Sequence, residues 1–167
     1  MEKLFVSNKN ESARMFKSDF LEFFSKVHFT TPLYFFLPYI GYLYYVTISE
    51  RSYSIGQFLG LTLVGILIWT VAEYLLHRFL FHYHPKSKFG KRFFFIIHGV
   101  HHDYPNDAKR LVLPPAISLP LATMFYFIFK NVAGEIFFPP VFASFLLGYL
   151  FYDMGHYAMH HFKLKGK

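Results

Sequence analysis

The chain contains no cysteine and few charged residues. Without cysteine it can form no disulfide, no thiolate zinc site and no cysteine-bound iron–sulfur cluster. Charged residues make up 16% of the 167 residues, whereas a typical soluble domain carries about 25%. Hydrophobic residues make up 54% and aromatic residues 23%. This balance excludes an ordinary soluble domain and predicts an all-α integral membrane protein with a single domain over residues 1–167.

Four apolar segments predict about four transmembrane helices. They cover residues 32–49, 53–76, 114–129 and 136–152. A spanning helix needs about 20 residues, so the third and fourth segments, which are short and interrupted by proline, could form a tilted pair or a hairpin. Gly56 and Gly60 lie four residues apart in the second segment and predict a close helix–helix contact there.

The region before the first span, residues 1–30, is predicted to contain an amphipathic helix. Residues 12–29 carry aromatic side chains at helical spacing with charged residues between them, and Ser12 is a candidate N-cap. This helix either lies in the membrane interface or packs against the cytosolic face of the protein itself.

The distribution of lysine and arginine predicts the orientation in the membrane. Five precede the first span, seven lie in residues 77–113 and three in the C-terminal tail, while the two opposite loops hold only Arg51 and Lys130. With four spans, this asymmetry places the N-terminus, the histidine-rich segments and the C-terminus in the cytoplasm. Because the basic residues cluster at the ends of apolar segments, the net charge of +7 indicates membrane topology and not a nucleic-acid partner.

Histidine is concentrated in two places. Six of the ten histidines lie in residues 77–102, and three more lie in HYAMHH at residues 156–161. His98 precedes His101 and His102 by three and four residues, and His156 precedes His160 by four. Histidines at these spacings share one face of a helix and can bind one ion. On the predicted cytoplasmic face the two clusters can form a common metal-binding cap.

His77 and His82 are five residues apart. On a regular α-helix this spacing turns their side chains about 140° away from each other. Either they bind different metals, or the helix breaks between them where it leaves the membrane. His28 and His84 are interpreted as amphipathic residues at the interface and not as ligands.

The histidines outnumber the four ligands of one tetrahedral ion, so two metals are expected. Imidazole suits iron, zinc, copper and nickel, so the ligand type leaves the metal open. Glu73 lies one turn before the first cluster and could accept a hydrogen bond from a ligand histidine, or pair with Arg78 or Arg92. Asp153, three residues before the second cluster, is a candidate of the same kind.

Three stretches resemble the histidine boxes of the membrane fatty acid hydroxylase and sterol desaturase superfamily: HRFLFH, HGVHHDYPNDAKRLVLPP and GYLFYDMGHYAMHH. The forms DYPNDAKRLVLPP and YDMGHYAMHH are most similar to the fatty acid 2-hydroxylase branch. The resemblance implies a four-helix membrane core capped by a cytosolic dimetal site. His161 matches a recurrent histidine whose role stays open. The implied metal ligands are His77, His82, His98, His101, His102, His156 and His160.

The resemblance also implies the chemistry. It implies hydroxylation of a fatty acyl chain, free or linked to a sphingolipid, at the carbon next to the carbonyl. It further implies two iron ions (zinc being possible in purified protein), dioxygen, and a separate cytochrome b5-like or ferredoxin-like electron donor. Lys109 and Arg110 either meet an anionic headgroup or only supply charge on the cytoplasmic side.

The family pattern continues beyond this sequence with another H-x-x-H-H box. We therefore expect either a C-terminally truncated domain or a reduced site completed by His161 and solvent. The alternatives are a sterol or carotenoid hydroxylase or desaturase of the same superfamily, and a non-catalytic remnant. A metal transporter would place its ionisable residues near the middle of the membrane, whereas these histidines lie at the ends of spans.

Overall fold

The computed structural model describes residues 5–7 and 9–162, and this part of the chain is helical, with no strand. The predicted all-α class is confirmed. Lys3, Lys163, Lys165 and Lys167, which contributed to the predicted orientation, lie outside the described residues. The elements are α1 (Asp19–Phe24), α2 (Thr31–Ser49), α3 (Ile55–Leu75), η1 (Leu76–Phe81), α4 (Lys88–Phe94), η2 (Phe95–Gly99), α5 (Val100–Asp103) and α6 (Pro115–His161), of which η1 and η2 are π-helical.

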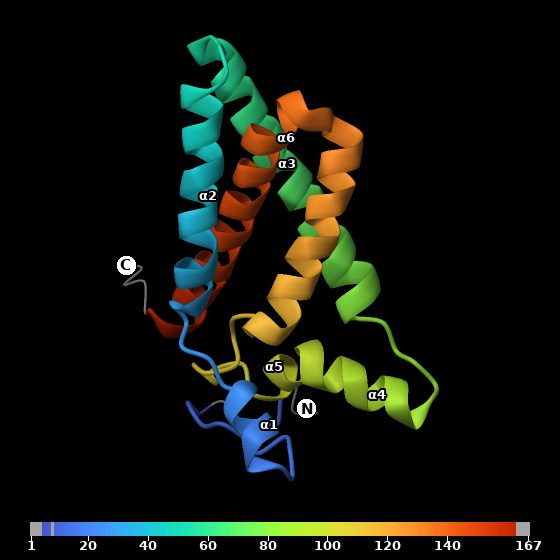
Figure 1. The fold of residues 1–167 in the computed structure, drawn as a ribbon. Coiled ribbons are helices and arrows are strands. Elements are labelled where there is room, and N and C mark those ends of the chain that lie inside the picture. The colour runs from blue at the N-terminus through green and yellow to red at the C-terminus, as the bar shows by residue number, and fades with distance from the viewer. Residues whose placement is uncertain (1–4, 8, 163–167) are drawn as a thin grey trace, which may run out of the picture.

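Helix α6 consists of two arms that meet at Gly134. This glycine has φ 68° and ψ 171°, which is not helical and which a residue without a side chain adopts at little cost. The chain reverses there, so the first arm (115–133) and the second arm (135–161) run antiparallel (Figure 1). The two arms correspond to the third and fourth predicted segments, and both are longer than predicted.

The long helices α2, α3 and the two arms of α6 form a bundle. The short helices α1, α4 and α5 lie together at one end of this bundle (Figure 1). Within the described residues, Ile55–Phe81 and Pro115–His161 are long and apolar enough to cross a membrane. Helix α2 has 19 residues, close to the length that a span needs.

The second arm of α6 is the core of the bundle. It packs against α2 and α3 and contributes most of the buried hydrophobic residues between Phe138 and Leu150. Gly65 of α3 permits a close approach, because a Cβ atom there would collide with the carbonyl oxygen of Val141. The contact predicted at Gly56 and Gly60 is wrong, since a Cβ atom at either position would have nothing within 4 Å among the described residues.

The helix predicted over residues 12–29 is confined to α1, six residues long, and its N-cap is Ser18 and not Ser12. The Ser12 hydroxyl instead donates to Asp107 Oδ1 at 2.5 Å. The backbone N–H groups of Met15 and Phe16 donate to Glu22 Oε2 at 2.9 and 3.1 Å. These contacts hold the segment before α1 out of a helical conformation.

A candidate metal centre formed by two histidine groups

Seven histidines gather into two groups at the end of the bundle where the short helices lie. The first group is His77, His82, His98 and His102, and the second is His101, His156 and His160. Within each group one nitrogen of every ring lies within 4.8 Å of the others. These are the seven residues predicted as ligands. That they bind metal stays a prediction.

The π-helical turn η1 brings His77 and His82 into the same group. The backbone N–H of His82 donates to the carbonyl of His77 at 3.2 Å, a bond across five residues in place of four. A wider turn of this kind aligns residues five apart on one face. The two Nε2 atoms therefore lie 3.1 Å apart in one group. The angle of about 140° applies to a regular α-helix; here the helix neither stays regular nor breaks between the two histidines, but widens to a π-helical turn.

Neighbouring histidines His101 and His102 serve different groups. The Nε2 atom of His102 lies 3.0 Å from that of His98, whereas the Nε2 atom of His101 lies 3.1 Å from that of His156. Consecutive side chains on a helix diverge by about 100°, so helix α5 forms a wall shared by the two groups. Helix α6 supplies the other side of the second group through His156 and His160.

The nitrogen atoms suit metal ligation. Two ligands at right angles, each about 2.1 Å from an ion, lie about 3.0 Å apart, close to the spacing of these Nε2 pairs. Burial, and after it the neighbouring imidazoles, lower the pKa of His98 and of His101 to about 3. Both rings are therefore neutral near pH 7, with lone pairs available. Lone pairs that converge in this way are satisfied by a shared proton or by a cation.

Glu73 is placed to orient His77, one of the seven candidate ligands. Its Oε1 atom lies 3.4 Å from Nδ1 of His77, the nitrogen that faces away from the first group. The alternative partners are engaged elsewhere: Arg78 donates to the hydroxyl of Tyr74, and Arg92 donates to a backbone carbonyl. A carboxylate in this position fixes the orientation of the imidazole ring.

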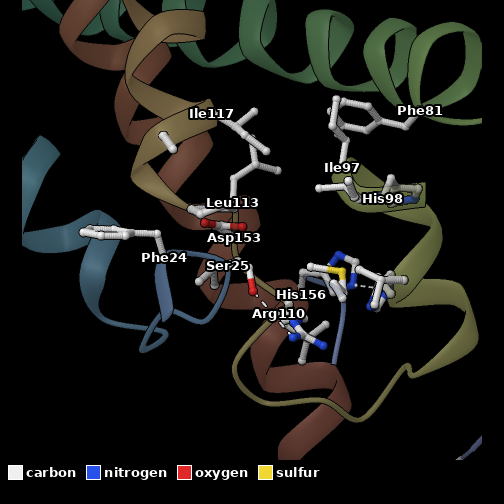
Figure 2. A pocket seen from close by; sticks show the side chains of 18 of the residues that line it. Phe24, Ser25, Phe81, Ile97, His98, Arg110, Leu113, Ile117, Asp153 and His156 are labelled. Atoms are coloured by element: carbon white, nitrogen blue, oxygen red, sulfur yellow. Dashed lines mark hydrogen bonds between the residues drawn. The ribbon is translucent and has the colours of Figure 1, made fainter. Parts of the chain in front are cut away.

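Asp153 and His161, the other two candidates near the second cluster, belong to neither histidine group. Asp153 is buried, presents its carboxylate to a cavity (Figure 2), and its Oδ2 atom has no hydrogen-bond partner in the described part of the chain. The ring of His161 stacks on Tyr157 at 4.5 Å and belongs to neither group. His28 and His84 also lie outside both groups; His28 contacts the hydroxyl of Thr30 at 2.8 Å.

A cavity of about 230 Å³ adjoins both groups. His98 and His156 face it, Phe24 of α1 closes one side, and Phe81 and Ile97 close another (Figure 2). Most of its remaining lining is apolar, so the cavity offers a water-poor space beside the histidines. A lipid chain is the kind of molecule that such a wall accommodates.

The two candidates for headgroup contact differ in exposure. Lys109 is exposed, whereas the side chain of Arg110 is 2% exposed and its Nη2 lies 2.6 Å from Glu22 Oε1. Arg110 also donates to the carbonyl of Ala13. Its charge is thus paired inside the protein, where it ties the N-terminal segment to the loop after α5. Sequence reasoning missed Glu22, which resembled one more charge on the polar face of a helix.

Comparison with known proteins points to the same family as the histidine motifs do. Residues 62–167 match the family model for fatty acid hydroxylase. The fatty acid 2-hydroxylase of Rattus norvegicus is 38% identical over 166 residues, which cover 88% of this chain and 45% of that protein. A dihydroceramide fatty acyl 2-hydroxylase of Arabidopsis thaliana is 38% identical, covering 90% of this chain and 63% of that protein.

A solved structure agrees with these relatives. Full-length scs7p, of which only the hydroxylase domain is visible, superposes with a TM-score of 0.81 at 34% identity, covering 87% of this chain and 56% of that one. The chain spans about half the length of the proteins that it matches. The match over residues 62–167 includes both histidine groups. By sequence and by fold, this chain belongs to the fatty acid hydroxylase family.

Proposed function

We propose that this protein hydroxylates a fatty acyl chain, free or linked to a sphingolipid, at the carbon next to the carbonyl. One observation carries the proposal: two histidine groups that could each hold a metal ion line an apolar cavity. The relatives named above support it, since one is a fatty acid 2-hydroxylase and another a dihydroceramide fatty acyl 2-hydroxylase.

The two groups would hold two metal ions, four histidines binding one and three the other. Iron is the better choice, because zinc has no redox chemistry. Bound iron would supply the oxidation in which one atom of dioxygen enters the C–H bond and the other leaves as water, using two protons and two electrons from a separate donor. Glu73 would hold His77 in its orientation, and the apolar wall would keep the chain next to the histidines and exclude water.

We further propose that α2, α3 and both arms of α6 cross the membrane, with the histidine groups on the cytoplasmic side. The positive-inside distribution of lysine and arginine supports this orientation. The gathering of α1, α4 and α5 at one end of the bundle supports a cap on that side (Figure 1). The site would then lie at the depth where an acyl chain meets its headgroup.

Lipid analysis tests the activity. The protein is expressed in cells that make no 2-hydroxy fatty acids, supplied with isotopically heavy dioxygen, and the lipids are analysed by mass spectrometry. The parent and the control H84A should form 2-hydroxy acyl chains that carry the heavy oxygen, whereas H98A should form none. A hydroxylated sterol or a desaturated chain in place of that product would contradict the proposal and favour another activity of the superfamily.

A further inference from the structure

Three cavities follow one another from the histidines to the surface of the bundle. The cavity beside the histidine groups adjoins a smaller cavity of about 60 Å³ between the long helices. The two cavities share Phe81, Leu113, Tyr152 and Asp153 in their lining. That second cavity shares three further residues with a groove of about 360 Å³ on the outer face of α2 and the first arm of α6: Phe36, Ala122 and Leu146. Neighbouring cavities in this series are thus divided only by side chains that they share.

The lining of this series of cavities loses its charged side chains away from the histidines. The second cavity retains the carboxylates of Glu73 and Asp153 at its inner end, whereas no ionisable carboxylate, lysine, arginine or histidine lines the outer groove. In the groove, Phe35, Leu119 and Phe127 expose their side chains on the outer surface. An aliphatic chain could follow this route mainly in contact with apolar side chains, because the polar side chains that line the groove are only the hydroxyl-bearing Tyr39, Thr123 and Tyr126.

Ala122 has the smallest side chain of the three residues that line both the second cavity and the groove. The other two residues shared by the second cavity and the groove, Phe36 and Leu146, are only 4% and 2% exposed and belong to the packed core. They cannot move aside without opening that core. Ala122 is partly buried against the same core and lines both cavities, so a larger side chain at this position would take up space where they meet.

We propose that these cavities join into a path for the substrate's acyl chain, which passes Ala122 and leaves the protein between α2 and the first arm of α6, and that the small side chain of Ala122 is what allows chains longer than this passage to be accepted. The inference rests on the proposed function. From Pro114, which lines the cavity beside the histidines, to Ala122 the helix rises about 12 Å. An extended chain advances about 1.25 Å per carbon, so roughly ten carbons reach Ala122. Since the path opens outward, longer chains are accepted with their ends in the bilayer.

Chain-length competition tests the role of Ala122. Membranes containing the parent, A122F or M124F receive equal amounts of two acyl substrates, one of about eight carbons and one of about 24, chosen on either side of the estimated passage. Met124 is exposed and lines none of the three cavities, so M124F controls for an added ring on the same helix. We expect A122F to lower the ratio of long to short product by roughly tenfold or more, and M124F to leave the ratio unchanged.

The outcomes separate this inference from the proposed function. Equal loss of both products in A122F, or no change in their ratio, would overturn the path. Failure of the parent protein to hydroxylate either chain would instead refute the function. A second measurement needs no variant: a long acyl probe with a diazirine at its far end should crosslink to residues of the outer groove such as Leu119 and Thr123. Crosslinks confined to the cavity beside the histidines would contradict the path even if the A122F protein failed to fold.

Discussion

A single carboxylate, Glu22, holds the N-terminal segment against the cavity. Its Oε1 atom lies 2.6 Å from Nη2 of Arg110 and 2.8 Å from Nζ of Lys26, and its Oε2 atom accepts two backbone hydrogen bonds. Both Glu22 and Arg110 are buried. A buried pair is costly to break, because the remaining charge is left without a partner.

Replacing Glu22 should therefore destabilise the protein. We expect E22Q to lower the free energy of unfolding by about 3 kcal/mol, since buried Arg110 loses its nearer carboxylate partner and keeps only Asp107, whose Oδ2 atom lies 3.6 Å from Nη1. The control is D19N, which removes an exposed ion pair with Arg14 in the same helix; the Asp19 side chain is 92% exposed. Exposed pairs contribute about 0–1 kcal/mol. Thermal unfolding in detergent should show a much larger fall in Tm for E22Q, and equal shifts would contradict the assigned role.

The same carboxylate makes a pH-dependent contribution to stability. Burial by itself would raise the pKa of Glu22, but hydrogen bonds from Lys26 and from the backbone of Phe16 and Met15, together with the charge of Arg110, lower the pKa from 4.5 to about 2. A lowered folded-state pKa stabilises the protein fully above the unfolded value and progressively less below it. The Tm difference between the parent and E22Q should shrink as the pH falls from about 4.5 toward 2. A constant difference over this range would show that Glu22 is not the titrating group.

At the scale of single residues, the sequence predicted those features that depend on the spacing of neighbouring residues. The separations of three and four residues among His98, His101 and His102 indicated a shared helical face; the structure groups His98 with His102, whereas His101 lies in the second group. The pairing of Glu22 with Arg110 joins residues 88 positions apart. No local periodicity contains that information, so both residues were assigned to solvent-exposed or headgroup-facing roles.

The π-helical turn η1 converts a spacing of five residues into a shared face. It continues the winding of α3 without a break and ends at His82. Hydrophobic periodicity presupposes about 3.6 residues per turn, so a wider turn is invisible to it. The sequence therefore identified both histidines as candidates but not their membership of one group.

The close approach of α3 and α6 depends on Gly65. In G65A the new methyl group would collide with the backbone of α6, which cannot move as a side chain can. We expect this variant to lose about 1–3 kcal/mol of stability through overpacking. In G60A the methyl group meets nothing within 4 Å among the described residues, and alanine favours a helix by up to about 1 kcal/mol. A thermal-shift comparison in which G60A is the less stable protein would contradict this packing.

At the scale of the whole molecule, the long helices form a bundle and the histidine groups lie at one end of it (Figure 1). Apolar segments and their prolines predicted the positions of these long helices closely, because hydropathy along a span is a local property. The reversal at Gly134 and the compact α1 follow from a single backbone conformation and from distant contacts. For this reason their details were not available from the sequence.

The absence of cysteine makes the proposed orientation testable with single labels. S52C lies between α2 and α3, and K86C lies between η1 and α4; both positions are exposed. A membrane-impermeant maleimide added to intact cells should label S52C and not K86C, and disrupting the membrane should make both reactive. Labelling of both in intact cells, or of K86C alone, would contradict the four-span arrangement.

The central claim is that seven histidines form two separate metal sites, and metal content per chain tests it most directly. Protein is purified in detergent without chelators and its metals are measured by elemental analysis. About two metal ions per chain, including iron, are expected from the two histidine groups, with about one remaining in either H98A or H156A and no change in H84A. One ion or none in the parent, or full retention of metal in both H98A and H156A, would contradict the account.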